Sequence, residues 1–100
     1  MVRFERSARV AQGKLQEARQ WAQKVTDYAN KNHPEGKLQV FSERFGNIGK
    51  VLWQADFDDL AALNQYQKSF DTDQGYWDLL NKSTELFIED SVRDTVYETL

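Results

Sequence analysis

The sequence predicts an α+β domain in which a four-stranded antiparallel sheet carries two helices on one face. Three observations predict this fold class. Apolar and polar residues alternate near both ends of the chain and in two central segments, as in half-buried strands. Two longer segments repeat apolar residues every three or four positions, as amphipathic helices do. The chain has 100 residues, 40% hydrophobic and 29% charged, so we expect residues 1–100 to form one domain.

The first strand and the first helix are predicted within the first third of the chain. Residues alternate from Val2 to Val10, and only Arg6 interrupts the apolar side. A helix is expected to begin near Lys14 and to end near residue 32, because Pro34 disfavours helical geometry in the residue before it. Its apolar stripe consists of Leu15, Ala18, Trp21, Ala22, Val25, Tyr28 and Ala29.

Two central strands, residues 37–45 and 50–57, are predicted to form a hairpin around the turn at residues 46–49. We pair Phe45 with Lys50, although a slip of one residue would exchange the two faces. One face then holds Leu38, Val40, Val51, Trp53, Ala55 and Phe57. The other face holds Gln39, Phe41, Glu43, Phe45, Leu52, Gln54 and Asp56.

The second helix and the last strand complete the pattern. Asp58 and Asp59 are N-cap candidates for a helix that begins at Leu60. Residues 71–75 break this helix, and a second piece is expected from Tyr76 to Phe87. Residues 91–100 alternate again and predict the fourth strand.

The order strand, helix, strand, strand, helix, strand predicts a ferredoxin-like arrangement when both crossovers are right-handed. Helices then cover one face of the sheet. The other face would carry Phe41, Phe45 and Leu52. An open face with large apolar residues favours a partner.

The amino-acid composition argues against several classes of chemistry and partner. Cysteine is absent, which excludes disulfides and thiol chemistry and fits a cytoplasmic location. No apolar run suggests a signal peptide or a membrane span. Residues 1–50 carry ten Lys/Arg against five Asp/Glu (+5), and residues 51–100 carry three against eleven (−8). The net charge of −3 opposes nucleic-acid binding, which the exposed Phe41 would otherwise permit.

Metal and catalytic motifs are weak. Asp58 and Asp59 fit helix capping better than a hard-cation loop with Asp56. His33 is the only histidine, and its position before Pro34 favours a solvated or C-capping role over catalysis or metal ligation. We therefore expect no metal and no cofactor.

Four features of the chain resemble a known superfamily. They are the arginine-bearing first strand, the hairpin at 45–47, Tyr76-Trp77 inside a broken second helix, and a last strand that begins near residues 91–94. With the element order, they resemble the dimeric α/β-barrel superfamily, which includes antibiotic-biosynthesis monooxygenase-like and NIPSNAP-like domains. The resemblance implies a homodimer whose two sheets close a barrel. It also implies small pockets, either between sheet and helices or inside the barrel. The activities of such proteins include cofactor-independent oxygenation of aromatic polyketides, haem degradation and muconolactone-type isomerisation.

Charged and aromatic residues of the predicted strands and helices supply the candidate site. A buried arginine in an apolar pocket could hold a carboxylate or enolate, whereas the simpler interpretation is an interface salt bridge. The aromatic candidates are Phe41, Trp53 and Trp77, together with Phe70 and Tyr76. They line either a pocket or the core. The candidate ligand-binding residues are Arg6, Phe41, Glu43, Arg44, Trp53, Trp77 and Arg93.

Two functions follow from these predictions. The first is a homodimer that binds a small apolar or aromatic ligand, as a candidate cofactor-independent monooxygenase. The alternative is a non-enzymatic domain whose role is dimerisation or partner binding, with a barrel packed solid by side chains. The sequence assigns no general base, because that assignment needs geometry.

Overall fold

The computed structural model describes residues 1–46 and 49–100. Its elements are β1 (Val2–Arg9), α1 (Leu15–Asn32), the short 3-10 helix η1 (Pro34–Gly36), β2 (Gln39–Ser42), β3 (Lys50–Phe57), α2 (Leu60–Ser69), α3 (Gln74–Asn81) and β4 (Arg93–Glu98). The sheet order is β2-β3-β1-β4, and all neighbouring strands are antiparallel. This is the ferredoxin-like topology that the sequence predicts, with the second helix divided into α2 and α3.

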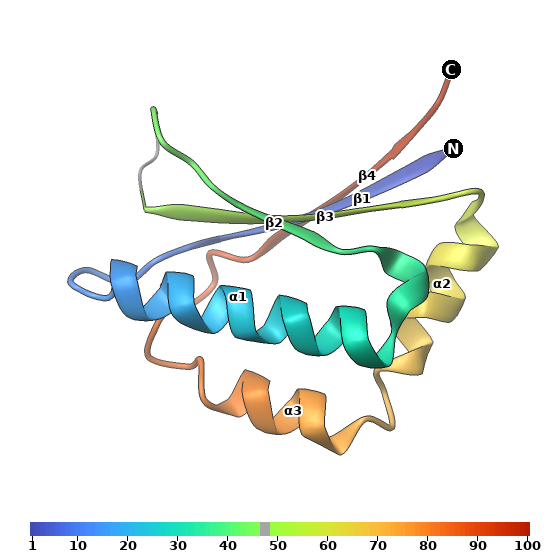
Figure 1. Ribbon diagram of the computed structural model, residues 1–100. Coiled ribbons are helices and arrows are strands. Elements are labelled where there is room, and N and C mark those ends of the chain that lie inside the picture. Colours follow the sequence, from blue (N-terminus) through green and yellow to red (C-terminus); the bar gives the residue numbers. More distant parts are fainter. Residues whose placement is uncertain (47–48) are drawn as a thin grey trace.

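All the helices lie on one side of the sheet (Figure 1). The register explains which side chains they cover, because directly paired residues share a face. Phe4 pairs with Ala55, Ala8 pairs with Val51, and Trp53 pairs with Val40. These positions face the helices and form the core together with Ala18, Ala22, Val25, Ala29, Leu63, Tyr66 and Leu79. The predicted division of the hairpin into two faces is therefore confirmed.

The pairing within the hairpin differs from the prediction by two residues. The backbone N–H of Glu43, instead of that of Phe45, donates to the carbonyl of Lys50, at 3.0 Å. A slip of two residues leaves every side chain on its predicted face, because the side-chain period of a strand is two. β2 is also shorter than predicted, and Phe45 lies beyond it with 88% of its surface exposed. Of the predicted turn, residues 47 and 48 lie outside the described residues.

Aspartates cap the N-termini of both later helices. The Asp59 side chain accepts a hydrogen bond from the Ala62 N–H at 2.8 Å, and Asp73 accepts one from the Tyr76 N–H at 3.2 Å. Such N-caps stabilise a helix by about 1 kcal/mol. The capping interpretation of Asp59 is thus confirmed, and Asp73 ends the joint between α2 and α3.

The second helical piece ends earlier than predicted, at Asn81 instead of Phe87. The chain that follows binds to the end of β1: Ala11 N–H donates to the Leu86 carbonyl, and Ile88 N–H donates to the Arg9 carbonyl. These backbone bonds replace helical ones, and they place Phe87 against Trp21 with ring centroids 5.6 Å apart. The apolar spacing that suggested a helix here reflects this packing.

The sheet face without helices carries a mixture of side chains. Phe41 and Tyr97 are about half exposed, and Leu52 is half-buried beside Phe41, its pairing partner. Arg3 and Asp56 form an ion pair on the same face at 2.9 Å. The predicted placement of Phe41 and Leu52 on this open face is confirmed, and homodimer formation stays a prediction.

Candidate functional site

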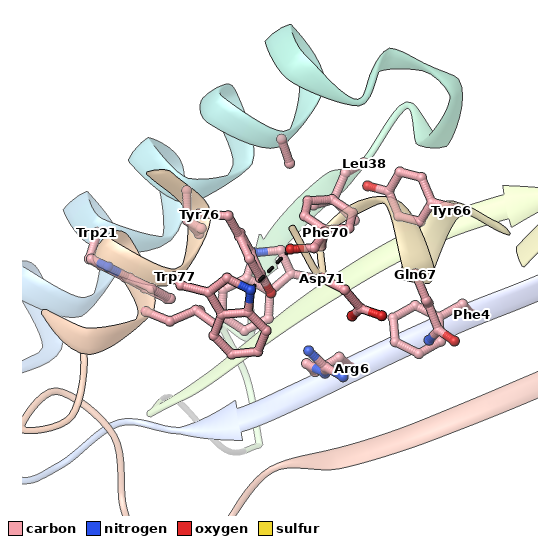
Figure 2. A pocket seen from close by; sticks show the side chains of 14 residues that line it. Phe4, Arg6, Trp21, Leu38, Tyr66, Gln67, Phe70, Asp71, Tyr76 and Trp77 are labelled. Carbon is pink, nitrogen blue, oxygen red and sulfur yellow. Dashed lines mark hydrogen bonds between the residues drawn. The ribbon is translucent and has the colours of Figure 1, made fainter. Parts of the chain in front are cut away.

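A pocket of about 410 Å³ lies between the sheet and the helices. Its walls are mainly aromatic, and strands β1 and β3 and helices α1, α2 and α3 all contribute (Figure 2). The lining residues are Phe4, Arg6, Trp21, Val25, Ala29, Leu38, Trp53, Tyr66, Gln67, Phe70, Asp71, Tyr76, Trp77 and Leu80.

Arg6 is the cation of this pocket. It occupies the one position of the helix-facing side of β1 that is not apolar, and β4 places Asp94 directly opposite it. The Nε and Nη2 groups of Arg6 donate to the two carboxylate oxygens of Asp94 at 2.7 and 2.8 Å. This bidentate pair fixes the guanidinium, which also lies over the Phe4 ring at 5.6 Å. The hydrogen bonds with Asp94 raise the pKa of Arg6, against the opposing effect of burial.

Tyr76 faces the arginine from the helix side of the pocket (Figure 2). Burial raises the pKa of its hydroxyl, and the nearby Arg6 only partly offsets that effect. Tyr76 is therefore a neutral phenol at physiological pH. A ligand oxygen at this end would meet one permanent cation and one neutral hydroxyl donor.

Tyr66 forms a second part of the wall. Burial raises the pKa of its hydroxyl to about 12, and this oxygen has no hydrogen-bond partner among the described residues. Gly36 makes room for the ring, because a Cβ at that position would lie 2.4 Å from two of its carbons. Only glycine allows this close approach.

The three tryptophans offer a ligand their ring surfaces alone. Each indole N–H already donates within the protein: Trp21 to the Leu79 carbonyl, Trp53 to the Thr26 hydroxyl and Trp77 to the Phe70 carbonyl, at 2.8 to 3.1 Å. Trp21 and Trp53 pack edge to face, with centroids 6.2 Å apart. Polar contacts in the pocket must therefore come from Arg6, Gln67, Asp71 and the tyrosines.

Three of the seven candidate residues lie at the pocket, and the other four lie elsewhere. Arg6, Trp53 and Trp77 line the pocket, as do Phe70 and Tyr76. Phe41 and Arg93 lie on the open face, since they pair with Leu52 and Ser7, which point away from the helices. Glu43 and Arg44 follow β2, where Glu43 lies 3.8 Å from the Lys50 ammonium group. The structure does not bring these four residues to the pocket.

His33 differs from its predicted environment. It is the C-cap residue of α1, as expected, but it is 8% exposed instead of solvated. Its Nε2 lies 2.6 Å from an Asp73 oxygen, and its Nδ1 lies 2.9 Å from the Ser69 hydroxyl. Partners from a later helix and helix joint, distant in sequence, cover the ring. Within residues 1–46 and 49–100, no group of three or more His, Asp or Glu side chains is arranged to hold a metal ion.

Sequence reasoning missed several lining residues, chiefly Phe4, Trp21, Tyr66, Gln67 and Asp71. It also missed Asp94, the partner of Arg6. One signal was available, namely the interruption of an apolar strand face by Arg6, because a charge in that register needs a partner or a polar cavity. Trp21 belongs to the predicted apolar stripe of α1, and in the structure it both packs against Trp53 and lines the pocket.

Comparison with known proteins identifies the fold through solved structures alone. No protein-family model matches the sequence, and no curated protein matches it either. Solved structures do match over almost the whole chain. A NIPSNAP domain protein from Burkholderia xenovorans has a TM-score of 0.79 at 12% identity, covering 100% of this chain and 95% of that one.

Two further structures agree with this result. A NIPSNAP family protein with unknown function from Agrobacterium tumefaciens has a TM-score of 0.77 at 15% identity, covering 97% of this chain and 86% of its own. A putative antibiotic biosynthesis monooxygenase from Deinococcus radiodurans has a TM-score of 0.71 at 17% identity, covering 99% and 92%. The chain therefore has the ferredoxin-like fold that these NIPSNAP and antibiotic biosynthesis monooxygenase structures share.

Proposed function

We propose that this chain binds a small, largely aromatic molecule in the pocket between its sheet and its helices. The observation that carries the proposal is the pocket itself, with aromatic walls and one arginine–aspartate pair at its polar side. Its volume of about 410 Å³ falls within the range of about 300–1,000 Å³ that is usual for ligand sites.

The polar groups define the ligand further. Arg6 and Asp94 together are electrically neutral, and Asp71 adds a second carboxylate to the lining, so the pocket has little net attraction for a strongly charged anion. It can instead donate hydrogen bonds from Arg6 and Tyr76 to a single oxygen, while the rings of Trp53, Phe70 and Trp77 contact a flat apolar body. A phenol, an enol or a ketone on an aromatic skeleton has this combination.

As an enzyme, the chain would be a cofactor-independent monooxygenase that acts on the molecule bound in this pocket. This activity is supported by the shared fold with the putative antibiotic biosynthesis monooxygenase and by the polar end of the pocket. Donors fixed in a largely apolar site stabilise negative charge that develops on a substrate oxygen. Arg6, held by Asp94, and Tyr76 would have this role. The geometry singles out no general base.

The homodimer is a separate part of the proposal. Phe41 and Leu52 form a paired apolar patch on the β2–β3 side of the open sheet face, Tyr97 lies on the opposite edge strand, and a second sheet would cover them. The alternative function, dimerisation without a ligand, leaves the pocket without a role, so we favour ligand binding.

Titration with 1-naphthol tests the proposal, and naphthalene is the matched control that lacks the oxygen. Tryptophan fluorescence reports binding, because three indoles line the pocket. We expect 1-naphthol to bind about tenfold more tightly than naphthalene, the effect of one charge-assisted hydrogen bond of about 1.5 kcal/mol. Equal affinities would contradict the role of Arg6, and failure of both compounds to bind would contradict the pocket as an aromatic site.

A further inference from the structure

The Tyr66 hydroxyl is a buried polar group without a hydrogen-bond partner among residues 1–46 and 49–100. Only 6% of the residue is exposed, so the hydroxyl is out of reach of bulk water as well. A buried donor that makes no hydrogen bond destabilises the folded protein, because it has lost its bond to water and gained none in return. Nearly all such groups in folded proteins are paired, so this one needs an explanation.

Packing holds the Tyr66 ring in this position. Phe57 and Phe70 pack against it with ring centroids 5.1 and 5.0 Å away, and the contact with Phe70 is edge to face. The hydroxyl end of the ring lies directly against Gly36, where a Cβ would come within 2.7 Å of the oxygen. Contacts from three elements, β3, α2 and η1, therefore keep the hydroxyl from turning toward another partner.

The hydroxyl belongs to the wall of the aromatic pocket. Tyr66 lines the pocket together with Leu38 and Phe70, and Figure 2 shows the hydroxyl end of its ring directed toward these two side chains. Arg6 lies at a separate part of the same wall (Figure 2). The pocket therefore has two separate polar points: the donors of Arg6 and Tyr76 are one, and the Tyr66 hydroxyl is the other.

The other polar side chains of the pocket are satisfied without a ligand. Gln67 and Asp71 are exposed, so water can bind to them. Arg6 already donates two hydrogen bonds to Asp94. Among the described lining residues, Tyr66 is thus the one with a buried side-chain oxygen that neither the protein nor bulk water satisfies.

The state of the hydroxyl indicates what it can bind. Burial raises the pKa of Tyr66 to about 12, and the negative charge of Glu35 adds to this effect. The group therefore keeps its hydrogen at physiological pH and can donate it to an acceptor oxygen. The charge of Glu35 also disfavours an anion at this place, so the acceptor that fits best is an uncharged oxygen, in a carbonyl or a hydroxyl group.

We propose that the Tyr66 hydroxyl donates to a second, uncharged oxygen of the ligand, so that the pocket selects aromatic molecules with oxygens at two separate ring positions. The first oxygen meets Arg6 and Tyr76, and the second completes the hydrogen bond that Tyr66 lacks. A ligand with both oxygens relieves a cost that the free protein bears, and a ligand with one oxygen does not. This selection rests on the proposed ligand-binding function, whereas the cost of the unpaired hydroxyl is a property of the free protein.

The stability of Tyr66→Phe tests the cost in the free protein, because this substitution removes the hydroxyl and keeps the ring. We expect the melting temperature to rise by about 4 °C. Tyr28→Phe is the matched control, since the Tyr28 hydroxyl donates to Asp73 at 2.5 Å, and its loss should lower the melting temperature. An unchanged or lower melting temperature for Tyr66→Phe, including failure to fold, would mean that the hydroxyl has a partner in the free protein and would overturn the proposal.

Binding of two-oxygen ligands tests the selection. The wild-type protein and Tyr66→Phe would each be titrated with 1-naphthol and with 1,5-, 2,6- and 2,7-dihydroxynaphthalene, while the tryptophan indole signals are followed by nuclear magnetic resonance. We expect at least one dihydroxynaphthalene to bind Tyr66→Phe about fivefold more weakly than the wild type, and 1-naphthol to bind both alike.

The outcomes separate the two proposals. Equal affinities of the two proteins for every dihydroxynaphthalene would overturn the role of Tyr66 and leave the proposed function intact. An equal loss for 1-naphthol would assign Tyr66 to the first oxygen and would also overturn the selection of a second one. Failure of all four compounds to bind the wild type would contradict the proposed function, and this inference with it.

Discussion

Two arginine–aspartate pairs on β1 have nearly the same geometry and very different surroundings. Arg3 bonds Asp56 through Nε and Nη2 at 2.9 and 3.1 Å, and Arg6 bonds Asp94 through the same atoms at 2.7 and 2.8 Å. The side chains of both pairs are equally exposed, at 40% and 43%. Yet three residues of separation place them on opposite faces of the sheet, because side chains alternate along a strand.

The difference lies in what surrounds each pair. Arg3 lies on the open face, where exposed ion pairs contribute about 0–1 kcal/mol to stability. Arg6 lies at the edge of an aromatic pocket, with Phe4 below it and Tyr76 opposite. The Arg3–Asp56 pair is thus an exposed ion pair on the open face. The chemically identical Arg6–Asp94 pair orients a guanidinium at the pocket.

The largest difference between the two faces should appear in stability. Trp53 on the pocket face is 8% exposed, whereas Phe41 on the open face is 45% exposed. We expect Trp53→Ala to lower the free energy of unfolding by about 3–5 kcal/mol, because it leaves a cavity. Phe41→Ala should cost no more than about 1 kcal/mol in the monomer. Denaturant unfolding at low protein concentration measures both, and similar losses would mean that the open face is covered in solution.

Assembly should depend on the open face. We expect the chain of 11.7 kDa to migrate as a dimer in size-exclusion chromatography with light scattering. Phe41→Asp should weaken that dimer by about 2 kcal/mol or more, because it places a charge in the apolar Phe41–Leu52 patch of the proposed interface. Ile88→Asp is the matched control, since Ile88 is similarly exposed, at 47%, but lies outside the sheet strands. A monomeric wild-type protein at micromolar concentration would remove the argument for a closed barrel.

Ligand affinity should distinguish the two arginines directly. Arg6→Met removes the cation but keeps an unbranched side chain, and we expect it to abolish the roughly tenfold preference for 1-naphthol over naphthalene. Arg3→Met makes the same change on the open face and should leave that preference intact. An equal effect of the two substitutions would show that net charge, rather than the pocket, controls binding.

The smallest expected effect concerns acid stability. The hydrogen bonds from Arg3 lower the pKa of Asp56, so the folded state favours its carboxylate form. The resulting stabilisation is present above the ordinary aspartate pKa of about 3.9 and is lost as the pH falls through the lower value of the folded state. Because the pair is exposed, the effect should be within about 1 kcal/mol. Asp56→Asn should reduce the difference in unfolding free energy between pH 6 and pH 3, and an increased difference would contradict this assignment.

Much of the fold could be predicted because it depends on local patterns. Alternation identified β1 and β3, the apolar stripe of Leu15 to Ala29 identified α1, and aspartates marked the start of α2. The hairpin faces were correct although the pairing was shifted by two residues, since two is the period of a strand. The predicted end of α3 at Phe87 was wrong. Leu80 and Phe87 are spaced as on one face of a helix, but Phe87 is buried because the chain after Asn81 packs back on β1.

The site was harder to predict because its parts come from distant segments. Arg6 stood out in its strand, but only the register of β4 shows that Asp94 faces it. His33 looked solvated because its partners, Ser69 and Asp73, lie 36 and 40 residues further along the chain. Phe41 and Arg93 are suitable residue types for a site, yet their register directs them away from the pocket.

A chemical-shift map distinguishes ligand binding in the Arg6 pocket from binding on the open face. The ¹⁵N-labelled protein would be titrated with 1-naphthol while the arginine Nε and tryptophan indole signals are followed. We expect shifts at Arg6 Nε and at the Trp53 and Trp77 indoles, with Arg3 Nε unchanged. Shifts at Arg3 without shifts at Arg6, or no saturable shift at any of these groups, would contradict it.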